Sequence, residues 1–203
     1  MTGLRHPSWW VGISFLLAGC GAAATQSNTG GTPTISVSGS TPTASANSAN
    51  EFSCVTQSGG DASLAAQLTA VRTAQFDGYD QLTFQYAAPV TGAALHGVPA
   101  FTVASHSSHF IKDASGQPLP LDGAAGLLIV AHNASGWDTL APTLQQTYTG
   151  SLDMHPGLQA IREVAEVGDF ERTLSWGVGL SSAACFRVSA LTDPSRLVVD
   201  IQR

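Results

Sequence analysis

The sequence predicts an all-β fold, an antiparallel β-sandwich with little helix, preceded by a signal peptide and a disordered linker. Apolar and polar residues alternate along 81–86 (QLTFQY) and 173–180 (TLSWGVGL), as expected for strands. Turn-forming pairs such as Asp77-Gly78 and Asp193-Pro194 separate these segments from other short apolar runs. Many short strands divided by turns are typical of a sandwich or a barrel.

Composition narrows the class of protein. The 203 residues contain eight Lys and Arg against fourteen Asp and Glu, for a net charge of −6. Nucleic acid is excluded as an expected partner, because scattered arginines in a net-acidic chain do not supply the clustered positive charge that such binding needs. Charged residues make up 11% of the chain, against about 25% in a typical protein. A surface rich in uncharged polar groups suits a location outside the cytoplasm.

The first 20 residues, MTGLRHPSWWVGISFLLAGC, predict an export signal. Arg5 precedes an apolar run from Trp9 to Ala18, which is short of the roughly 20 residues that span a bilayer. Residues 17–20 (LAGC) resemble the bacterial lipobox, whose cysteine receives a diacylglyceryl group and becomes the new N-terminus. We expect residues 1–19 to be a lipoprotein signal peptide and Cys20 to be the lipid attachment site. An ordinary signal peptide with an incidental cysteine is the alternative.

Residues 20–53 are expected to comprise the lipidated cysteine and a disordered linker of Ser, Thr, Gly and Ala. Residues 21–50 include no charged side chain, and they contain too little apolar surface to offset the entropy of ordering. Such a linker would hold the folded domain, residues 54–203, away from a lipid anchored in the cell membrane. A passive spacer is the simpler interpretation, and a glycosylated stalk is the alternative.

Two cysteines, Cys54 and Cys185, remain in the folded region. In a chain that faces an oxidising exterior they are expected to form one disulfide, although two separate buried thiols are the alternative. The bridge would join the start of the domain to a strand near its end, and it would exclude both thiols as catalytic nucleophiles.

Further strands are expected wherever short apolar segments lie between turns. In 81–86 the side chains of Leu82, Phe84 and Tyr86 share one face, and in 173–180 the inward set is Leu174, Trp176, Val178 and Leu180. Both strands are expected to be buried on one face only. The other candidates are 70–75, 100–105, 127–132, 186–191 and 197–201. Residues 62–68 allow one or two turns of helix, and 161–167 is ambiguous between helix and strand.

Polar residues near these strands are candidates for binding. The FDGYD segment (76–80) is interpreted first as a hairpin turn, with carboxylates that contact a sugar or a cation as the alternative. Arg196 and Asp200 would share one face of the last strand, where they serve structure or meet a ligand. The carboxylate pairs Glu163/Glu166 and Asp169/Glu171 suit acid–base chemistry only in a cleft, and solvated charge is the simpler interpretation.

Motifs for catalysis and for cofactors are absent from the sequence. It contains no GxSxG, HExxH, Walker-type or dinucleotide-binding pattern. His106 and His109 have no recognisable third ligand, so no metal is expected there. We therefore expect no enzymatic activity, no metal and no cofactor.

Three stretches, FDGYDQLTFQY (76–86), REVAEVGDFERTLSWGVGL (162–180) and FRVSALTDPSRLVVDIQ (186–202), together resemble the AMIN-like domain of bacterial envelope lipoproteins. The closing DPxRLVVD-type strand relates this family to the AMIN domain that localises cell-wall amidases. The resemblance covers residues 68–203. It implies a β-sandwich without catalytic machinery, and attachment to peptidoglycan as in the better-known AMIN domains.

The resemblance also implies positions of interest. The candidate ligand-binding set is Asp77, Tyr79, Asp80, Asp169, Asp193 and Arg196, and Gly78, Phe170 and Pro194 also match the motifs. Gln81 and Gln85 stand where many members are expected to carry charged side chains.

The leading hypothesis is a non-catalytic module that binds cell-wall glycan, with Tyr79, Trp137 and Tyr148 as aromatic residues in expected loops. The alternative is a protein-interaction adaptor that tethers an envelope enzyme or transporter near the membrane. A hydrolase is a third hypothesis, and it requires a cleft with paired carboxylates of raised pKa.

Overall fold

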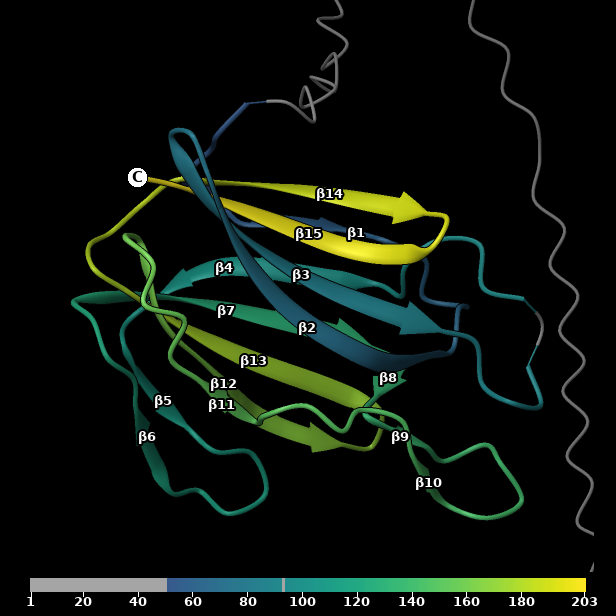
Figure 1. The fold of residues 1–203 in the computed structure, drawn as a ribbon. Coiled ribbons are helices and arrows are strands. Elements are labelled where there is room, and N and C mark those ends of the chain that lie inside the picture. Colours follow the sequence, from purple (N-terminus) through teal and green to yellow (C-terminus); the bar gives the residue numbers. More distant parts are fainter. Residues whose placement is uncertain (1–50, 93) are drawn as a thin grey trace, which may run out of the picture. The chain divides into compact units, whose positions relative to one another are not determined.

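The computed structural model describes residues 51–92 and 94–203, and this part of the chain is a two-layer β-sandwich (Figure 1). The expected signal peptide (1–19), Cys20 and most of the expected linker lie outside the described residues. The predicted all-β class is confirmed. No helix in the described part is long and apolar enough to cross a bilayer.

One layer is a six-stranded sheet in the order β1-β4-β7-β13-β12-β11, and the other is a five-stranded sheet in the order β14-β15-β3-β2-β8. Paired strands are antiparallel except β2 and β8. Two short hairpins, β5–β6 and β9–β10, complete the described part. The strands are β1 (Gln57–Gly59), β2 (Ala66–Phe76), β3 (Tyr79–Ala87), β4 (Phe101–His106), β5 (His109–Ile111), β6 (Pro118–Pro120), β7 (Ala125–His132), β8 (Ala134–Ser135), β9 (Trp137–Asp138), β10 (Gln145–Gln146), β11 (Asp153–Met154), β12 (Ile161–Phe170), β13 (Thr173–Leu180), β14 (Phe186–Thr192) and β15 (Ser195–Gln202).

The core lies between the two sheets, and period-two alternation creates it. Leu82, Phe84 and Tyr86 of β3 are buried, as the sequence predicts. Trp176 of β13 is buried against the edges of Phe84 and Tyr148, with ring centroids 5.9 and 5.7 Å away. Aromatic pairs in this geometry add stability beyond the area they bury.

The predicted disulfide between Cys54 and Cys185 is present. Cys54 follows Ser53 in the chain, and Cys185 precedes Phe186. Ser53 and Phe186 form an isolated antiparallel β-bridge, in which each backbone amide donates to the other residue's carbonyl, at 2.9 and 3.0 Å. The covalent link thus joins the segment before β1 to the start of β14.

The two ambiguous segments are strands. Residues 161–167 belong to β12, which pairs with β13 on one side and β11 on the other. The helical turns considered for 62–68 do not form, because β2 begins at Ala66 and pairs there with Ala134 of β8. Tertiary pairing decides both cases, since these patterns are too short for periodicity alone to decide.

The expectation that 173–180 is buried on one face only is wrong. Ser175, Gly177 and Gly179 are buried as well, because the β5–β6 hairpin and the segment after it cover the outer face of β13. Phe110 and Leu121 form a second apolar cluster there with residues of β12. A Cβ on Gly177 would lie 3.0 Å from the Leu121 side chain, so glycine allows this close cover.

Candidate functional site

The six candidate ligand-binding residues lie in three separate places. Tyr79 of β3 pairs with Gln202 of β15, whereas Gln85 pairs with Arg196, so the Asp77 and Asp193 turns lie at opposite ends of the five-stranded sheet. Asp169 contacts Ser135 of β8, at the sheet edge opposite β14. The structure therefore does not bring the set together into one site.

At the first place, Asp77 and Gly78 form the turn between β2 and β3. Gly78 has a φ of 81°, a conformation that favours glycine. The Tyr79 ring stacks on Phe76 at 5.1 Å, and the guanidinium carbon of Arg187 lies 4.9 Å from its centroid. These contacts hold the Tyr79 ring between Phe76 and Arg187.

Asp80 is fully buried and connects the two layers. Its Oδ2 accepts hydrogen bonds from the backbone amides of Ala160 (2.6 Å) and Ile161 (3.2 Å), at the start of β12. Asp80 is in phase with Leu82 and Phe84 along β3, so its side chain points inward and not toward a ligand. We assign Asp80 a structural role.

At the second place, a cis peptide bond joins Asp193 to Pro194 in the β14–β15 turn. The Arg196 Nε donates a hydrogen bond to the Pro194 carbonyl at 3.4 Å. Arg196 has no ion pair with Asp200, whose carboxylate instead accepts hydrogen bonds from Arg187 and Gln81, each at 2.8 Å. Arg196 and Asp200, which the sequence places on one face of the last strand, thus have separate partners.

At the third place, Asp169 lies in a hollow of about 450 Å³, which we call the Trp137 hollow. Trp137 is 40% exposed there, so its indole is accessible to a ligand. The hollow is lined by Ser135, Trp137, Thr139, Leu144, Asp169, Glu171 and Arg172.

Hydrogen bonds that Asp169 accepts position the turn that carries Trp137. Oδ2 of Asp169 accepts from the Ser135 hydroxyl at 3.0 Å and from the Gly136 amide at 2.7 Å. The Trp137 amide in turn donates to the Ser135 hydroxyl at 3.0 Å. The carboxylate therefore fixes where the indole stands.

Arg172 fixes the opposite wall of the Trp137 hollow. Its Nε donates to Oδ1 of Asn133 and its Nη2 to the Asn133 carbonyl, both at 2.7 Å, and its Nη1 donates to the Thr139 hydroxyl at 3.1 Å. Partial burial lowers the pKa of Arg172, while the charges of Asp138 and Asp169 raise it. With three donors engaged, the guanidinium acts mainly as a clamp on the loop.

The backbone at this wall is strained. Glu171 and Arg172 form the turn between β12 and β13 with φ values of 49° and 60°. Two-residue hairpins of this kind favour Asn and Gly at such positions, and a bulkier residue there costs energy that the surrounding structure must supply. Strain of this kind clusters at functional sites.

Asp138 holds the loop that follows Trp137. It is fully buried and accepts hydrogen bonds from the backbone amides of Val90 (2.8 Å), Leu140 (3.0 Å) and Ala141 (3.1 Å). The hydrogen bond from Val90 is the main cause that lowers the pKa of Asp138, and burial opposes it. The indole thus projects from a rigid loop.

A second hollow of about 460 Å³ adjoins the first, and we call it the Phe170 hollow. It shares Glu171 with the Trp137 hollow, and the ring of Phe170 is 57% exposed. Its lining residues are Asp113, Val130, Phe170, Glu171, Thr173 and Ser175. Two exposed aromatic rings therefore flank one exposed carboxylate at the β12–β13 turn.

These side chains suit binding. Trp137 and Phe170 offer apolar faces, and Glu171, Thr173 and Ser175 offer hydrogen-bonding groups. Sequence reasoning named Asp169 and Phe170 and noted Trp137 as a loop aromatic, but it missed Leu144 and Arg172 as neighbours. An aromatic residue directly after the Ser135-Gly136 turn was the one available signal.

Comparison of the sequence with models of known protein families gives one match. A family model of the AMIN-like domain matches residues 66–203, from the first residue of β2 to the last residue of the chain. The chain belongs to the AMIN-like domain family. No curated protein and no solved structure shows a significant match. The AMIN-like match includes every residue that lines the two hollows.

Family membership bears on function at a coarse level. AMIN-like domains occur in bacterial envelope proteins, which implies an extracytoplasmic location. They are in general non-catalytic binding domains related to the cell wall.

Proposed function

We propose that this protein is a lipid-anchored envelope protein whose AMIN-like domain binds cell-wall glycan, without catalysis, at the Trp137 hollow. The observation that carries the proposal is the exposed indole of Trp137, held rigidly beside the Asp169 and Glu171 carboxylates. The apolar face of a sugar ring packs on an aromatic face, while its hydroxyl groups bond to polar neighbours.

The Phe170 hollow extends this surface in one direction. Because both hollows share Glu171, a linear glycan would meet Trp137 and Phe170 with successive sugar rings. The chain carries a net charge of −6, and the exposed charge between the two rings is a carboxylate. We therefore expect recognition of neutral hydroxyl and amide groups rather than of anionic groups.

Sedimentation of the purified full chain with protein-free peptidoglycan tests the proposal. Loss of the indole in Trp137→Ala should weaken retention about fivefold or more, since an aromatic contact contributes roughly 1 kcal/mol or more. Phe76→Ala is the matched control, because Phe76 is 43% exposed at the other end of the sandwich and lines neither hollow.

Equal retention of Trp137→Ala and the unaltered chain would refute the assignment of the site. If the unaltered chain does not sediment, and one specific protein is instead isolated with it from an envelope extract, the adaptor hypothesis is the better one.

The proposed anchor is tested separately at Cys20. We expect the unaltered chain to partition into a detergent phase and to carry a diacylglyceryl group on Cys20, as mass spectrometry of the N-terminal peptide would show. Cys20→Ser should leave the chain unacylated and in the aqueous phase. Detergent partitioning that is unchanged in Cys20→Ser would contradict the anchor.

A further inference from the structure

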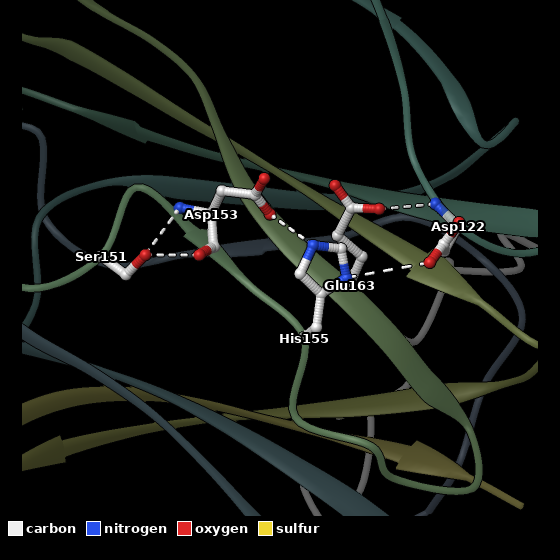
Figure 2. A network of polar contacts seen from close by, with 5 residues as sticks. All are labelled: Asp122, Ser151, Asp153, His155 and Glu163. Carbon is white, nitrogen blue, oxygen red and sulfur yellow. Dashed lines mark hydrogen bonds and ion pairs between the residues drawn. The ribbon is translucent and has the colours of Figure 1, made fainter.

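A group of metal-ligating side chains lies on the outer face of the six-stranded sheet, away from both hollows. It consists of Asp122, Asp153, His155 and Glu163, which we call the His155 cluster (Figure 2). Sequence reasoning treated Glu163 as solvated charge and assigned His155 no role.

Strand pairing brings the cluster together from three segments. Met154 of β11 pairs with Val164 of β12, so His155 and Glu163 are the next neighbours along this antiparallel pair. Val164 faces the core, and Glu163 therefore faces outward. The register of β12 shifts between Ile161 and Glu163, a bulge of the kind that re-aims side chains near functional sites.

Gly179 allows Asp122 to lie close to Glu163. Glu163 pairs with Gly179 on the other side of β12, and a Cβ on that glycine would collide with the Asp122 carbonyl oxygen. The missing side chain lets the segment carrying Asp122 lie directly over the sheet. As a result, Oε2 of Glu163 accepts the Asp122 amide at 2.7 Å.

The ligand atoms are close to one another. One ligand atom each from Asp122, His155 and Glu163 lie within 4.8 Å of one another. Atoms bound to one tetrahedral zinc ion at about 2.0–2.1 Å lie about 3.4 Å apart, so small side-chain rotations of exposed groups suffice to close the site. The Asp122 and His155 side chains are 77% and 57% exposed, so both have room for these rotations.

His155 lies between two carboxylates. Its Nδ1 is 3.8 Å from Oδ2 of Asp122, and its Nε2 is 3.4 Å from Oδ1 of Asp153. A histidine that ligates a metal through one ring nitrogen commonly donates the other N–H to a carboxylate, and Asp153 lies where it would accept that N–H. The Ser151 hydroxyl accepts the Asp153 amide at 3.2 Å and so holds that residue in place (Figure 2).

Glu163 is the buried member of the His155 cluster. It is only 7% exposed, and its second oxygen, Oε1, accepts no hydrogen bond from the described part of the chain and stays accessible to solvent. Among described residues, three carboxylates thus face a single imidazole, an imbalance that a divalent cation would offset.

We propose that Asp122, His155 and Glu163 bind one divalent transition-metal ion of the zinc type, with Asp153 orienting His155. The mixture of imidazole nitrogen and carboxylate oxygen favours zinc over calcium, which takes six to eight oxygen ligands. Bound metal would tie the Asp122 segment to β11 and β12, so the site is structural in character and independent of glycan binding.

Calorimetric titration of the metal-free, purified full chain with Zn²⁺ tests this proposal. We expect one zinc ion per chain and a rise in the thermal unfolding temperature on binding. His155→Ala and Glu163→Gln should each weaken binding at least tenfold, and Glu163→Gln keeps an oxygen to accept the Asp122 amide. His109→Ala, which removes an exposed histidine from β5, is the matched control and should leave binding unchanged.

Asp153→Asn tests the orienting role and should weaken zinc binding less than His155→Ala does. Unfolding of each metal-free variant at the same temperature as the unaltered chain shows that the fold is intact. The proposal is overturned if His155→Ala and Glu163→Gln bind zinc as tightly as the unaltered chain. It is also overturned if Ca²⁺ binds at this site and Zn²⁺ does not.

Discussion

Truncation of Trp176 to alanine should remove much of the stability of the sandwich. Trp176 is 1% exposed and packs against Phe84 and Tyr148, so the substitution opens a cavity between the two sheets. A buried tryptophan withdraws roughly 200 Å² from water, which corresponds to about 5 kcal/mol at about 25 cal/mol per Å². The alanine side chain retains about 1 kcal/mol of this burial free energy at the same coefficient per Å².

Two smaller effects change the stability loss expected for Trp176→Ala, in opposite directions. The edge-to-face contacts add roughly 1 kcal/mol each. The buried indole N–H of Trp176 has no hydrogen-bond partner among the described residues, and its removal returns about 1–3 kcal/mol. The net loss for Trp176→Ala is therefore about 3–5 kcal/mol, the range typical of buried tryptophan.

Urea unfolding of the full chain, followed by circular dichroism, measures this loss. With a slope of about 2 kcal/mol per molar urea, the midpoint should fall by about 2 M. Trp176→Phe keeps an aromatic ring and removes the unpartnered N–H, so it should cost only about 1–2 kcal/mol. A midpoint unchanged in Trp176→Ala would refute the packing derived for β13.

Three further predictions concern polar and covalent links. Asp80→Asn should lower the free energy of unfolding by about 2–3 kcal/mol in the same urea assay, because the charge that accepts two buried amides is lost; an unaltered midpoint would argue against the structural role. The hydrogen bond from Val90 lowers the pKa of Asp138 in the folded chain. The ionised Asp138 therefore stabilises the fold fully above the unfolded pKa of about 4, and this stabilisation is lost as the pH falls through the folded pKa. Urea midpoints measured below pH 4 should therefore fall in the unaltered chain and fall less in Asp138→Asn, and parallel profiles would contradict this cause. Reduction of the Cys54–Cys185 bridge, which closes a separation of 131 residues, should cost about 5 kcal/mol in the chain-entropy model, and a reductant without effect on the midpoint would exclude that contribution.

The strands that the sequence predicts are those with local signals. Alternation along 81–86 and turn chemistry at Asp77-Gly78 depend on neighbouring residues alone, and both are confirmed. The second buried face of β13 was missed because its cover comes from Phe110 and Leu121, more than 50 residues earlier in the chain. A glycine in a strand hints at close cover without naming what provides it.

The candidate sites show the same division. Sequence motifs singled out Asp169, but the neighbours that make a hollow around it come from the β8–β9 segment and from the turn at Arg172. The His155 cluster has no sequence motif, because its ligands at 122, 155 and 163 meet only when β11 pairs with β12 and Gly179 admits Asp122. Ligand spacing along the chain carries no signal when the residues come from different elements.

By itself, the sequence determined the all-β class, most strand positions, the disulfide and the family, because each follows from local periodicity, composition or a contiguous motif. Only the tertiary structure decided which polar residues are buried, which of them meet, and which aromatic rings stay exposed. These properties arise from the packing of one sheet on the other and from strand register. A shift in register by a single residue reverses the side chains that face the core, and no local pattern records where distant strands will pair.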